Sequence, residues 1–415
     1  MAPHAAYDVV VVGAGIVGAA CAWACARRGL RVLVLEGAGV GSGATAAGMG
    51  HIVVMDDSEA QFALTRYSQE LWQGLATDHA HPLPPEVEYT PSGTIWVAAD
   101  GEEMAEVERK HACYGDRGVP TEVLGAAALA RLEPNLRPGL AGGLRVPGDA
   151  VVYPPCAAAF FLEQARALGA EVLLGAQAAA IGGGSARLAG GREFAARVIV
   201  NAAGAQAGAL TPGLPIRGRK GHLVITDRYP GWVRHQLVEL GYLKSAHSHG
   251  AESVAFNVQP RATGQILIGS SRQWRQSGDD LIASGRGVPG IEARPSSDQR
   301  ERPGQKVASH FGDADGAVDH AILARMVERA REYMPGLARL LALRAWTGFR
   351  AATPDSLPLI GFWPDDPSVF LATGHEGLGI TTSLGTAELA AGQIAGATPA
   401  IRAACYHPHR DALAR

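Results

Sequence analysis

The chain alternates between unbroken apolar runs and segments whose apolar positions recur with a helical period. The first such run is at residues 8–12 (DVVVV). A glycine turn and an apolar segment follow it, and then a second run, RVLVLE, that ends at Glu36. Unbroken runs are typical of parallel strands that are buried on both faces of a sheet. The pattern therefore predicts a strand–helix–strand unit over residues 7–36.

The first apolar stretch is long enough to be confused with a membrane segment. Residues 9–26 are uncharged and mostly apolar, which in length alone would suit a membrane span or the core of a signal peptide. No basic residue precedes this stretch, and glycines divide it into a strand and a helix. We therefore expect a buried strand and helix, and no membrane span.

Further elements follow from the same two patterns. Helices are predicted over residues 58–76, 101–117, 125–132, 154–170 and 318–334. Strands are predicted as a hairpin over residues 87–98, at 171–175, at 196–208 before a glycine turn, and repeatedly between 216 and 269. Residues 276–317 are rich in Gly, Pro, Ser, Arg and Asp without any period, and they predict an exposed, flexible insertion.

Composition and charge narrow the classes of partner. The chain has 415 residues, is 47% hydrophobic and carries a formal net charge of −3 without a strong basic block, so nucleic acid is not an expected partner. Its five cysteines show neither CxxC nor metal-ligand spacing, so no metal site is predicted. This cysteine usage is typical of a reducing cytoplasm.

The turn after the first strand carries the first chemical signature. Gly13, Gly15 and Gly18 have the spacing GxGxxG, and Glu36 lies 23 positions after Gly13 at the end of the second strand. The glycines permit a tight turn and the approach of a pyrophosphate, the helix N-terminus attracts its phosphates, and the acid accepts ribose hydroxyls. Strand, helix, second strand and terminal acid together predict a dinucleotide site.

Two other features favour FAD over NAD as the dinucleotide. The segment after Glu36 is long, and its small residues make it flexible enough to wrap an extended cofactor. Gly204 follows a second buried strand. Residues 369–396 read as strand, glycine-rich turn and helix, and the positive end of that helix would suit the N1–C2=O edge of a flavin. A glycine turn without a ligand remains an equal alternative for this last segment.

Arg350 poses a separate question, because it lies within the apolar segment WTGFRAATPDSLPLIG. A guanidinium group keeps its charge in proteins, so a partly buried arginine needs an anion. The candidates are the carboxylate of a ligand and the carboxylate of Asp355, the nearest acid in the sequence.

Three segments together resemble the D-amino acid oxidase family of FAD flavoproteins, which includes glycine oxidase, sarcosine oxidase and the D-amino acid dehydrogenases. They are VVVVGAGIVGAACAWACARRGLRVLVLE, TGFRAATPDSLPLIG and TGHEGLGITTSLGTAELAA. The resemblance implies that Arg350 binds the α-carboxylate of the substrate and that the GHEGLGIT turn lies at the isoalloxazine ring. The loop GSGATAAGMGHI most resembles that of bacterial D-hydroxyproline dehydrogenases and related opine-oxidase-type subunits.

The resemblance also assigns candidate site residues. Cofactor contacts are expected from Gly13, Gly15, Ile16, Val17, Gly18, Glu36, Thr45, Ala47, Gly48, Ala178, Gly204, His375, Glu376, Gly377, Leu378, Gly379, Ile380 and Thr381. The substrate side is expected to include Met49, His51, Tyr242 and Arg350, with His51 and Arg350 as catalytic candidates. A contact within its own loop remains open for His51, and an ordinary strand position for Tyr242. Some relatives attach FAD through a histidine where this chain has Thr45, so noncovalent FAD is expected.

The expected fold is α/β (α+β when both domains are counted). A Rossmann-like FAD-binding domain would comprise residues 1–85, 145–215 and 340–415, and a mainly antiparallel β substrate domain residues 86–144 and 216–339. The expected reaction is oxidative deamination or dehydrogenation of a small amino or imino acid, with D-hydroxyproline or D-proline as first guess, by hydride transfer from the α carbon to flavin N5.

Several alternatives to this function remain open. They are a glycine/sarcosine-type oxidase that uses oxygen, an electron-transferring flavin subunit of a hetero-oligomeric amine dehydrogenase, and a nicotinamide-dependent dehydrogenase. A quinone or an electron-transfer protein is a further candidate partner, and the oligomeric state is left open. The expected location is the cytoplasm, including a peripheral position at the inner face of the membrane.

Overall fold

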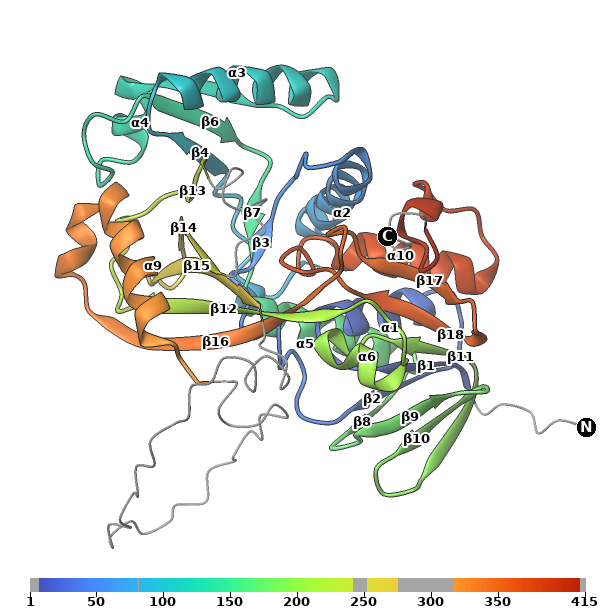
Figure 1. Cartoon of the computed structure of the whole chain (residues 1–415). Coiled ribbons are helices and arrows are strands. Elements are labelled where there is room, and N and C mark those ends of the chain that lie inside the picture. The colour runs from blue at the N-terminus through green and yellow to red at the C-terminus, as the bar shows by residue number, and fades with distance from the viewer. Residues whose placement is uncertain (1–6, 81, 242–251, 275–316, 411–415) are drawn as a thin grey trace, which may run out of the picture.

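A computed structural model describes residues 7–80, 82–241, 252–274 and 317–410, and it contains two eight-stranded sheets that lie side by side (Figure 1). Tyr242 and residues 276–316 of the predicted insertion lie outside the described residues. The two sheets correspond to the two expected kinds of domain, one with parallel strands and helices and one mainly antiparallel.

The first sheet is built around the predicted N-terminal unit. Its strands are, in order across the sheet, β17 (Leu359–Trp363), β18 (Asp366–Thr373), β11 (Glu193–Asn201), β1 (Tyr7–Val12), β2 (Val32–Glu36) and β8 (Glu171–Leu174). Neighbouring strands run parallel except for β17, which is antiparallel to β18. A hairpin of β9 (Ala178–Gly182) and β10 (Ser185–Leu188) extends from β11.

Helices cover one face of this sheet. They are α1 (Ile16–Ala26), α5 (Pro154–Ala167) and α10 (Ser383–Ala395), with α2 (Glu59–Thr77) packed on α10. Trp23 of α1 stacks on Phe161 of α5 with ring centroids 5.5 Å apart. Nearly every residue of α1 is buried, because the helix lies between the sheet and its neighbours. This burial explains the apolar run that could have been taken for a membrane segment.

The second sheet carries the remaining long strands. Its order is β16 (Ala342–Ala352), β12 (Arg217–Thr226), β15 (Ile266–Trp274), β14 (Glu252–Pro260), β13 (Gln236–Glu239), β4 (Thr94–Ala98), β6 (Gly142–Val146) and β5 (Glu122–Gly125). Neighbours are antiparallel except for β13 and β4. Helix α9 (His320–Tyr333) packs on one face, and α3 (Gly101–Asp116) and α4 (Ala126–Leu132) lie at the end remote from the first sheet (Figure 1).

A two-stranded sheet lies at the junction of the two larger ones. It pairs β3 (His51–Ile52) with β7 (Ala150–Val151). A short helix, α6 (Ala207–Leu210), follows the second glycine turn of the first sheet. The chain therefore crosses between the sheets close to His51, which is one of the predicted site residues.

Two sequence-based expectations are corrected by the structure. The hairpin expected over residues 87–98 is the single strand β4, which pairs with β6 and β13, because Pro91 and Gly93 interrupt the segment before it. Residues 342–352, which were assigned to the cofactor domain, form β16 in the second sheet. The chain returns to the first sheet only with β17.

Among the described ranges, no helix is both long enough and apolar enough to cross a membrane.

Candidate active site

The first glycine turn has the close packing that its sequence predicts. Gly13 has a φ of +105°, and a Cβ there would lie 2.6 Å from the carbonyl oxygen of Ala202. A Cβ at Gly18 would lie 2.0 Å from the carbonyl oxygen of Gly13, so α1 can begin this close to β1 only with glycine. The turn therefore brings the N-terminus of α1 to the end of the sheet, as a dinucleotide site requires.

Glu36 and Thr45 surround this helix N-terminus. The Glu36 carboxylate is buried and accepts hydrogen bonds from the N–H groups of Ala14 (2.7 Å) and Ala38 (2.6 Å). The hydroxyl of Thr45 accepts one from the N–H of Ile16 (3.1 Å). Because a carboxylate has about four acceptor positions, these two bonds leave capacity for ribose hydroxyls. The arrangement therefore fits the adenosine end of FAD.

The C-terminal glycine turn lies next to α1, since a Cβ at Gly379 would lie 3.9 Å from Val17. Within the described part of the chain, the N–H groups of Gly377, Gly379, Ile380 and Thr381 donate no hydrogen bond. Unpaired N–H groups at the start of a helix suit an electron-rich edge such as the flavin N1–C2=O group. This turn therefore fits the isoalloxazine end of the cofactor.

The two residues before these free N–H groups have structural bonds of their own. Burial lowers the pKa of His375 to about 3, and its Nε2 lies 2.9 Å from the hydroxyl of Thr386. Glu376 has a φ of +46°, and its N–H donates to the carbonyl of Ala351 at 2.8 Å. The N–H of Glu376 is therefore held by β16 and differs from the free N–H groups that follow it.

The loop of residues 45–51 joins the two glycine turns to the second sheet. A Cβ at Gly48 would lie 2.4 Å from Ile380, and a Cβ at Gly348 of β16 would lie 2.2 Å from the Cβ of Ala47. The hydroxyl of Thr381 donates to the carbonyl of His51 at 2.8 Å. Segments that are far apart in the sequence therefore meet around this loop.

The remaining predicted cofactor residues lie at two other strand ends. Ala178 begins β9 directly after Gln177, whose Cβ would lie 3.2 Å from a Cβ at Gly37. Gly204 has a φ of +56°, and its carbonyl accepts a hydrogen bond from Thr373 at 3.1 Å. Both positions therefore adjoin segments that are expected to bind the cofactor, next to Glu36 and β18 respectively.

Arg350 lies on β16, on the face of the second sheet that carries Gly221. One of its terminal nitrogens donates to the carbonyl of Ser271 at 3.0 Å. A Cβ at Gly221 would lie 2.4–2.7 Å from the terminal nitrogens and the central carbon of the guanidinium group, so the arginine crosses β12 above a position that only glycine leaves open.

Asp355, the alternative protein partner of Arg350, belongs to a different ion pair. Its two carboxylate oxygens accept hydrogen bonds from Arg410 at 2.6 and 2.7 Å, in a bidentate pair that is largely buried. The nearness of Asp355 to Arg350 in the sequence was therefore a poor guide to pairing.

Met49 and His51 adjoin Arg350 at the same junction. The side-chain amide of Gln259 donates to the carbonyl of Met49 at 2.6 Å, which ties the loop to β14. Burial lowers the pKa of His51 to about 4, against an opposing effect of Gln259 and with a smaller contribution from the charge of Arg350. His51 is therefore neutral at physiological pH.

Sequence reasoning missed a buried ion pair that does lie beside Arg350. Arg219, the cross-strand neighbour of Arg350, binds Glu376 at 2.9 Å, with both side chains about nine-tenths buried. Burial raises the pKa of Glu376, but the charges of Arg272, Arg219 and Arg350 outweigh burial and leave it below its usual value. The alternation of arginines along β12 (RGRKG) was the available signal, but the pairing of β12 with β16 was needed to read it.

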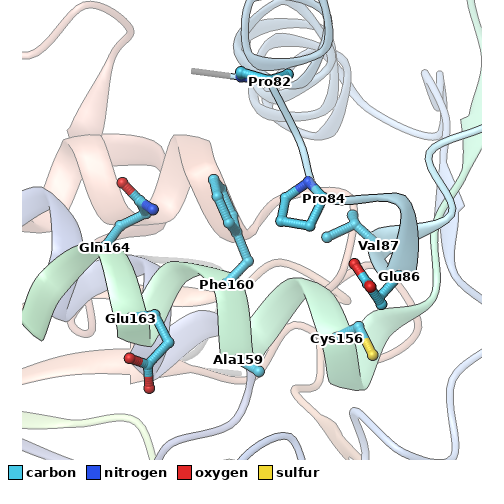
Figure 2. Close-up of a pocket in the computed structure, with 9 residues that line it drawn as sticks. All are labelled: Pro82, Pro84, Glu86, Val87, Cys156, Ala159, Phe160, Glu163 and Gln164. Atoms are coloured by element: carbon cyan, nitrogen blue, oxygen red, sulfur yellow. The ribbon is translucent and has the colours of Figure 1, made fainter. Parts of the chain in front are cut away.

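Neither a surface cavity nor a metal-binding group adds to this site in the part of the chain that the structure describes. A surface cavity of about 440 Å³ between α5 and residues 82–87 includes Phe160 and Cys156, with Glu86 and Glu163 beside them (Figure 2). None of the predicted site residues lines it, and its two carboxylates would repel an anionic substrate. Within the described ranges, no group of three or more His, Cys, Asp and Glu side chains could hold a metal ion.

Together, the parallel sheet, the dinucleotide turn and the second glycine turn define a flavin-type nucleotide-binding protein with a second, mainly antiparallel sheet. The FAD dependent oxidoreductase (DAO) family model matches residues 8–393, so the chain belongs to this family and is an FAD-dependent oxidoreductase. The expectations of fold class, family and cofactor are thereby confirmed.

Among curated proteins, the chain is similar to a glycine oxidase from Geobacillus kaustophilus, with 26% identity over 388 residues that cover 91% of this chain and 90% of that protein. It is equally similar to the hydrogen cyanide synthase subunit HcnC from Pseudomonas aeruginosa, with 26% identity covering 91% and 89%. The crystal structure of the Geobacillus kaustophilus glycine oxidase has a TM-score of 0.78 at 25% identity, covering 97% of this chain and 98% of that one.

Proposed function

We propose that the chain oxidises a small amino or imino acid at the carbon between its carboxylate and its nitrogen, with CH–NH or CH–NH2 as the donor group. The observation that carries this proposal is the position of Arg350. It is a permanent positive charge at the junction between the loop of residues 45–51 and the second sheet. The names of the curated relatives, a glycine oxidase and a subunit of hydrogen cyanide synthase, support a small amino acid as substrate.

Arg350 would bind the substrate carboxylate with two parallel hydrogen bonds, which fix the position and orientation of the α carbon. Such placement supplies a large share of the rate when a second reactant is held nearby. When bound, FAD supplies the two-electron acceptor for a hydride from this carbon. The residues of this chain that would hold FAD are those of the two glycine turns, with Glu36 at the adenosine end.

The charges of the site also act on the nitrogen of the substrate. A nearby positive charge disfavours an ammonium group, so Arg350 favours the neutral amine, whose lone pair assists departure of the hydride. The neutral state of His51 adds a polar group without further charge, and it can contact the amine by hydrogen bonding. Met49 would form the apolar wall beside it, where its side chain faces Gly269.

As substrate we favour a cyclic D-imino acid such as D-hydroxyproline or D-proline, because the loop GSGATAAGMGHI resembles that of D-hydroxyproline dehydrogenases. A glycine/sarcosine-type oxidase is the second candidate, supported by the glycine oxidase relative. A flavin subunit that passes electrons within a larger complex is the third, supported by the HcnC relative. A quinone or an electron-transfer protein would serve as acceptor, in the cytoplasm or at the inner face of the membrane.

One anaerobic experiment separates these candidates. The purified holoprotein is mixed without oxygen with D-hydroxyproline, D-proline, glycine, sarcosine and L-proline in turn, and the absorbance of oxidised flavin is followed. We expect at least one of them to bleach the flavin, and D-hydroxyproline or D-proline to do so fastest. Rapid recovery of the absorbance on adding air would indicate an oxidase, and slow recovery a dehydrogenase. Absence of bleaching by every amino and imino acid would contradict the proposed reaction and favour the electron-transferring subunit.

A further inference from the structure

His222 lies on β12 on the opposite face of the sheet from the site, and nothing in the sequence singled it out. Its neighbour Leu223 packs with Met49 on the site face, whereas Val224 packs with the core beneath α9. Because successive side chains of a strand point to opposite faces, His222 points toward α9, and it is fully buried. A buried histidine of this kind is held by specific hydrogen bonds.

The hydrogen bonds of His222 determine its tautomer. The N–H of Asp319 donates to Nε2 at 3.0 Å, so Nε2 carries the lone pair and the proton is on Nδ1. Nδ1 lies 2.9 Å from the hydroxyl oxygen of Ser271, to which it therefore donates. The backbone N–H of His222 donates to the same oxygen, also at 2.9 Å. Two donors from one residue thus hold the Ser271 side chain.

Ser271 is also the residue whose carbonyl oxygen accepts the hydrogen bond from Arg350, at 3.0 Å. The regular ladder between β12 and β15 is interrupted here: the paired positions stop at Lys220 with Gln273 and resume at Val224 with Ile268. At this interruption the strand positions are not fixed by a regular backbone ladder. The two hydrogen bonds from His222 fix Ser271 on the side of β12, while on its other side Ser271 remains paired with Val254 of β14.

We infer that His222 is a positioning residue for the substrate carboxylate: through Ser271, it fixes the carbonyl that holds the guanidinium group of Arg350. The same imidazole ring accepts from Asp319, the N-cap residue of α9, whose carboxylate accepts from Ala321 and Ile322. The start of α9 is thereby connected to Arg350 through the thickness of the sheet. The inference rests on the proposed function, because it assumes that Arg350 binds the carboxylate.

Two substitutions of His222 separate its two bonds. In His222→Asn the amide nitrogen can take the place of Nδ1 and keep the bond to Ser271, while the acceptor for Asp319 is lost. In His222→Gln the amide oxygen can take the place of Nε2 and keep the bond to Asp319, while the donor to Ser271 is lost. Ser271→Ala removes the hydroxyl and leaves the carbonyl that Arg350 uses, so it tests the same link without altering the histidine.

The assay compares KM and kcat for the best amino acid from the anaerobic panel with those for the corresponding decarboxylated amine, at equal FAD content. We expect His222→Gln and Ser271→Ala to raise KM for the amino acid about tenfold, which corresponds to one ordinary hydrogen bond, with a smaller change in kcat. His222→Asn should stay near wild type in KM. None of the three should change turnover of the amine, because the amine makes no bond to Arg350.

The possible outcomes are distinguishable. If Arg350→Met raises KM for the amino acid but His222→Gln and Ser271→Ala do not, the positioning role is wrong and the proposed function stands. If Arg350→Met has no selective effect on the amino acid, the proposed function itself fails. If His222→Gln does not yield folded protein, Ser271→Ala decides, and equal losses for the amino acid and the amine would show a purely structural role.

Discussion

Two glycines that face each other across β12 and β16 offer a sharp test of the site. Gly221 and Gly348 are paired in register, and neither has a positive φ, so alanine is conformationally acceptable at both. An added Cβ would nevertheless meet different neighbours, the guanidinium of Arg350 at Gly221 and the Cβ of Ala47 at Gly348. The same chemical change should therefore disturb the substrate at one position and the cofactor at the other.

The size of the effect follows from the distances. A Cβ at Gly221 would lie 2.4 Å from the nearest guanidinium nitrogen, whereas ordinary contacts begin at 3.4 Å, so the charged group must move by about 1 Å. The end of an arginine side chain can move that far, but it would leave its place beside the Ser271 carbonyl. Loss of one charge-assisted hydrogen bond costs about 1.5–3 kcal/mol, so we expect Gly221→Ala to raise KM roughly 10- to 100-fold.

The assay measures KM for the amino acid, FAD content and the melting temperature for Gly221→Ala and Gly348→Ala. Gly125→Ala serves as the control, because it lies on β5 with nothing within 4 Å of an added Cβ. We expect Gly221→Ala to keep its FAD with a raised KM, and Gly348→Ala to lose FAD affinity. An unchanged KM in Gly221→Ala, or equal loss of FAD in both variants, would refute the assignment of Arg350 to the substrate.

Three further predictions concern the cofactor and the pH dependence of stability. FAD should be released from the purified protein by acid or heat, because Thr45 stands where some relatives carry a histidine, and flavin that remains with acid-precipitated protein would contradict this. Glu36→Ala should weaken FAD binding by about 1.5–3 kcal/mol, as measured by equilibrium titration of the apoprotein, through loss of a charge-assisted bond to ribose. Burial raises the pKa of Asp149 from 3.8 to about 7, against the opposing bonds of Thr94, Val54 and Gln69. The folded state therefore holds this proton more tightly than the unfolded state, so the free energy of unfolding should fall by about 4 kcal/mol between pH 4 and 7, given about 3 pKa units at 1.36 kcal/mol each. Asp149→Asn should abolish this fall in urea titrations at pH 4 and 7, and an unchanged pH dependence would show that Asp149 is not its source.

The sequence was sufficient for the parts of the fold that depend on local pattern. The unit of residues 7–36 and the helices over residues 58–76 and 318–334 were predicted to within a few residues, because apolar spacing and caps decide them. The apolar pattern did not reveal which sheet β16 joins, since that depends on pairing with β12 more than a hundred positions earlier. The error over residues 87–98 came from reading two short apolar runs as partners when each pairs elsewhere.

The same distinction applies to the site. The glycines of the two turns and Arg350 were identified because their motifs are contiguous in the sequence. The contributions of Gly221 and Ser271 could not be seen, because each is defined by how close Arg350 comes to it across neighbouring strands. Asp355 was considered as a partner only because it is five positions away, whereas Arg410, which binds it, is 55 positions from it.

The central claim is that Arg350 binds the carboxylate of an amino or imino acid substrate. The most direct measurement compares wild type, Arg350→Met and Arg350→Lys for turnover of the amino acid and of its decarboxylated amine, at equal FAD content. We predict that Arg350→Met retains FAD and loses about 2–5 kcal/mol in kcat/KM for the amino acid, with little change for the amine, which is already a poor substrate of the wild type. Arg350→Lys should recover only part of the loss, because an ammonium group cannot make the two parallel bonds. Equal losses for both substrates, or unfolding of Arg350→Met, would show that the arginine is structural and would contradict the account.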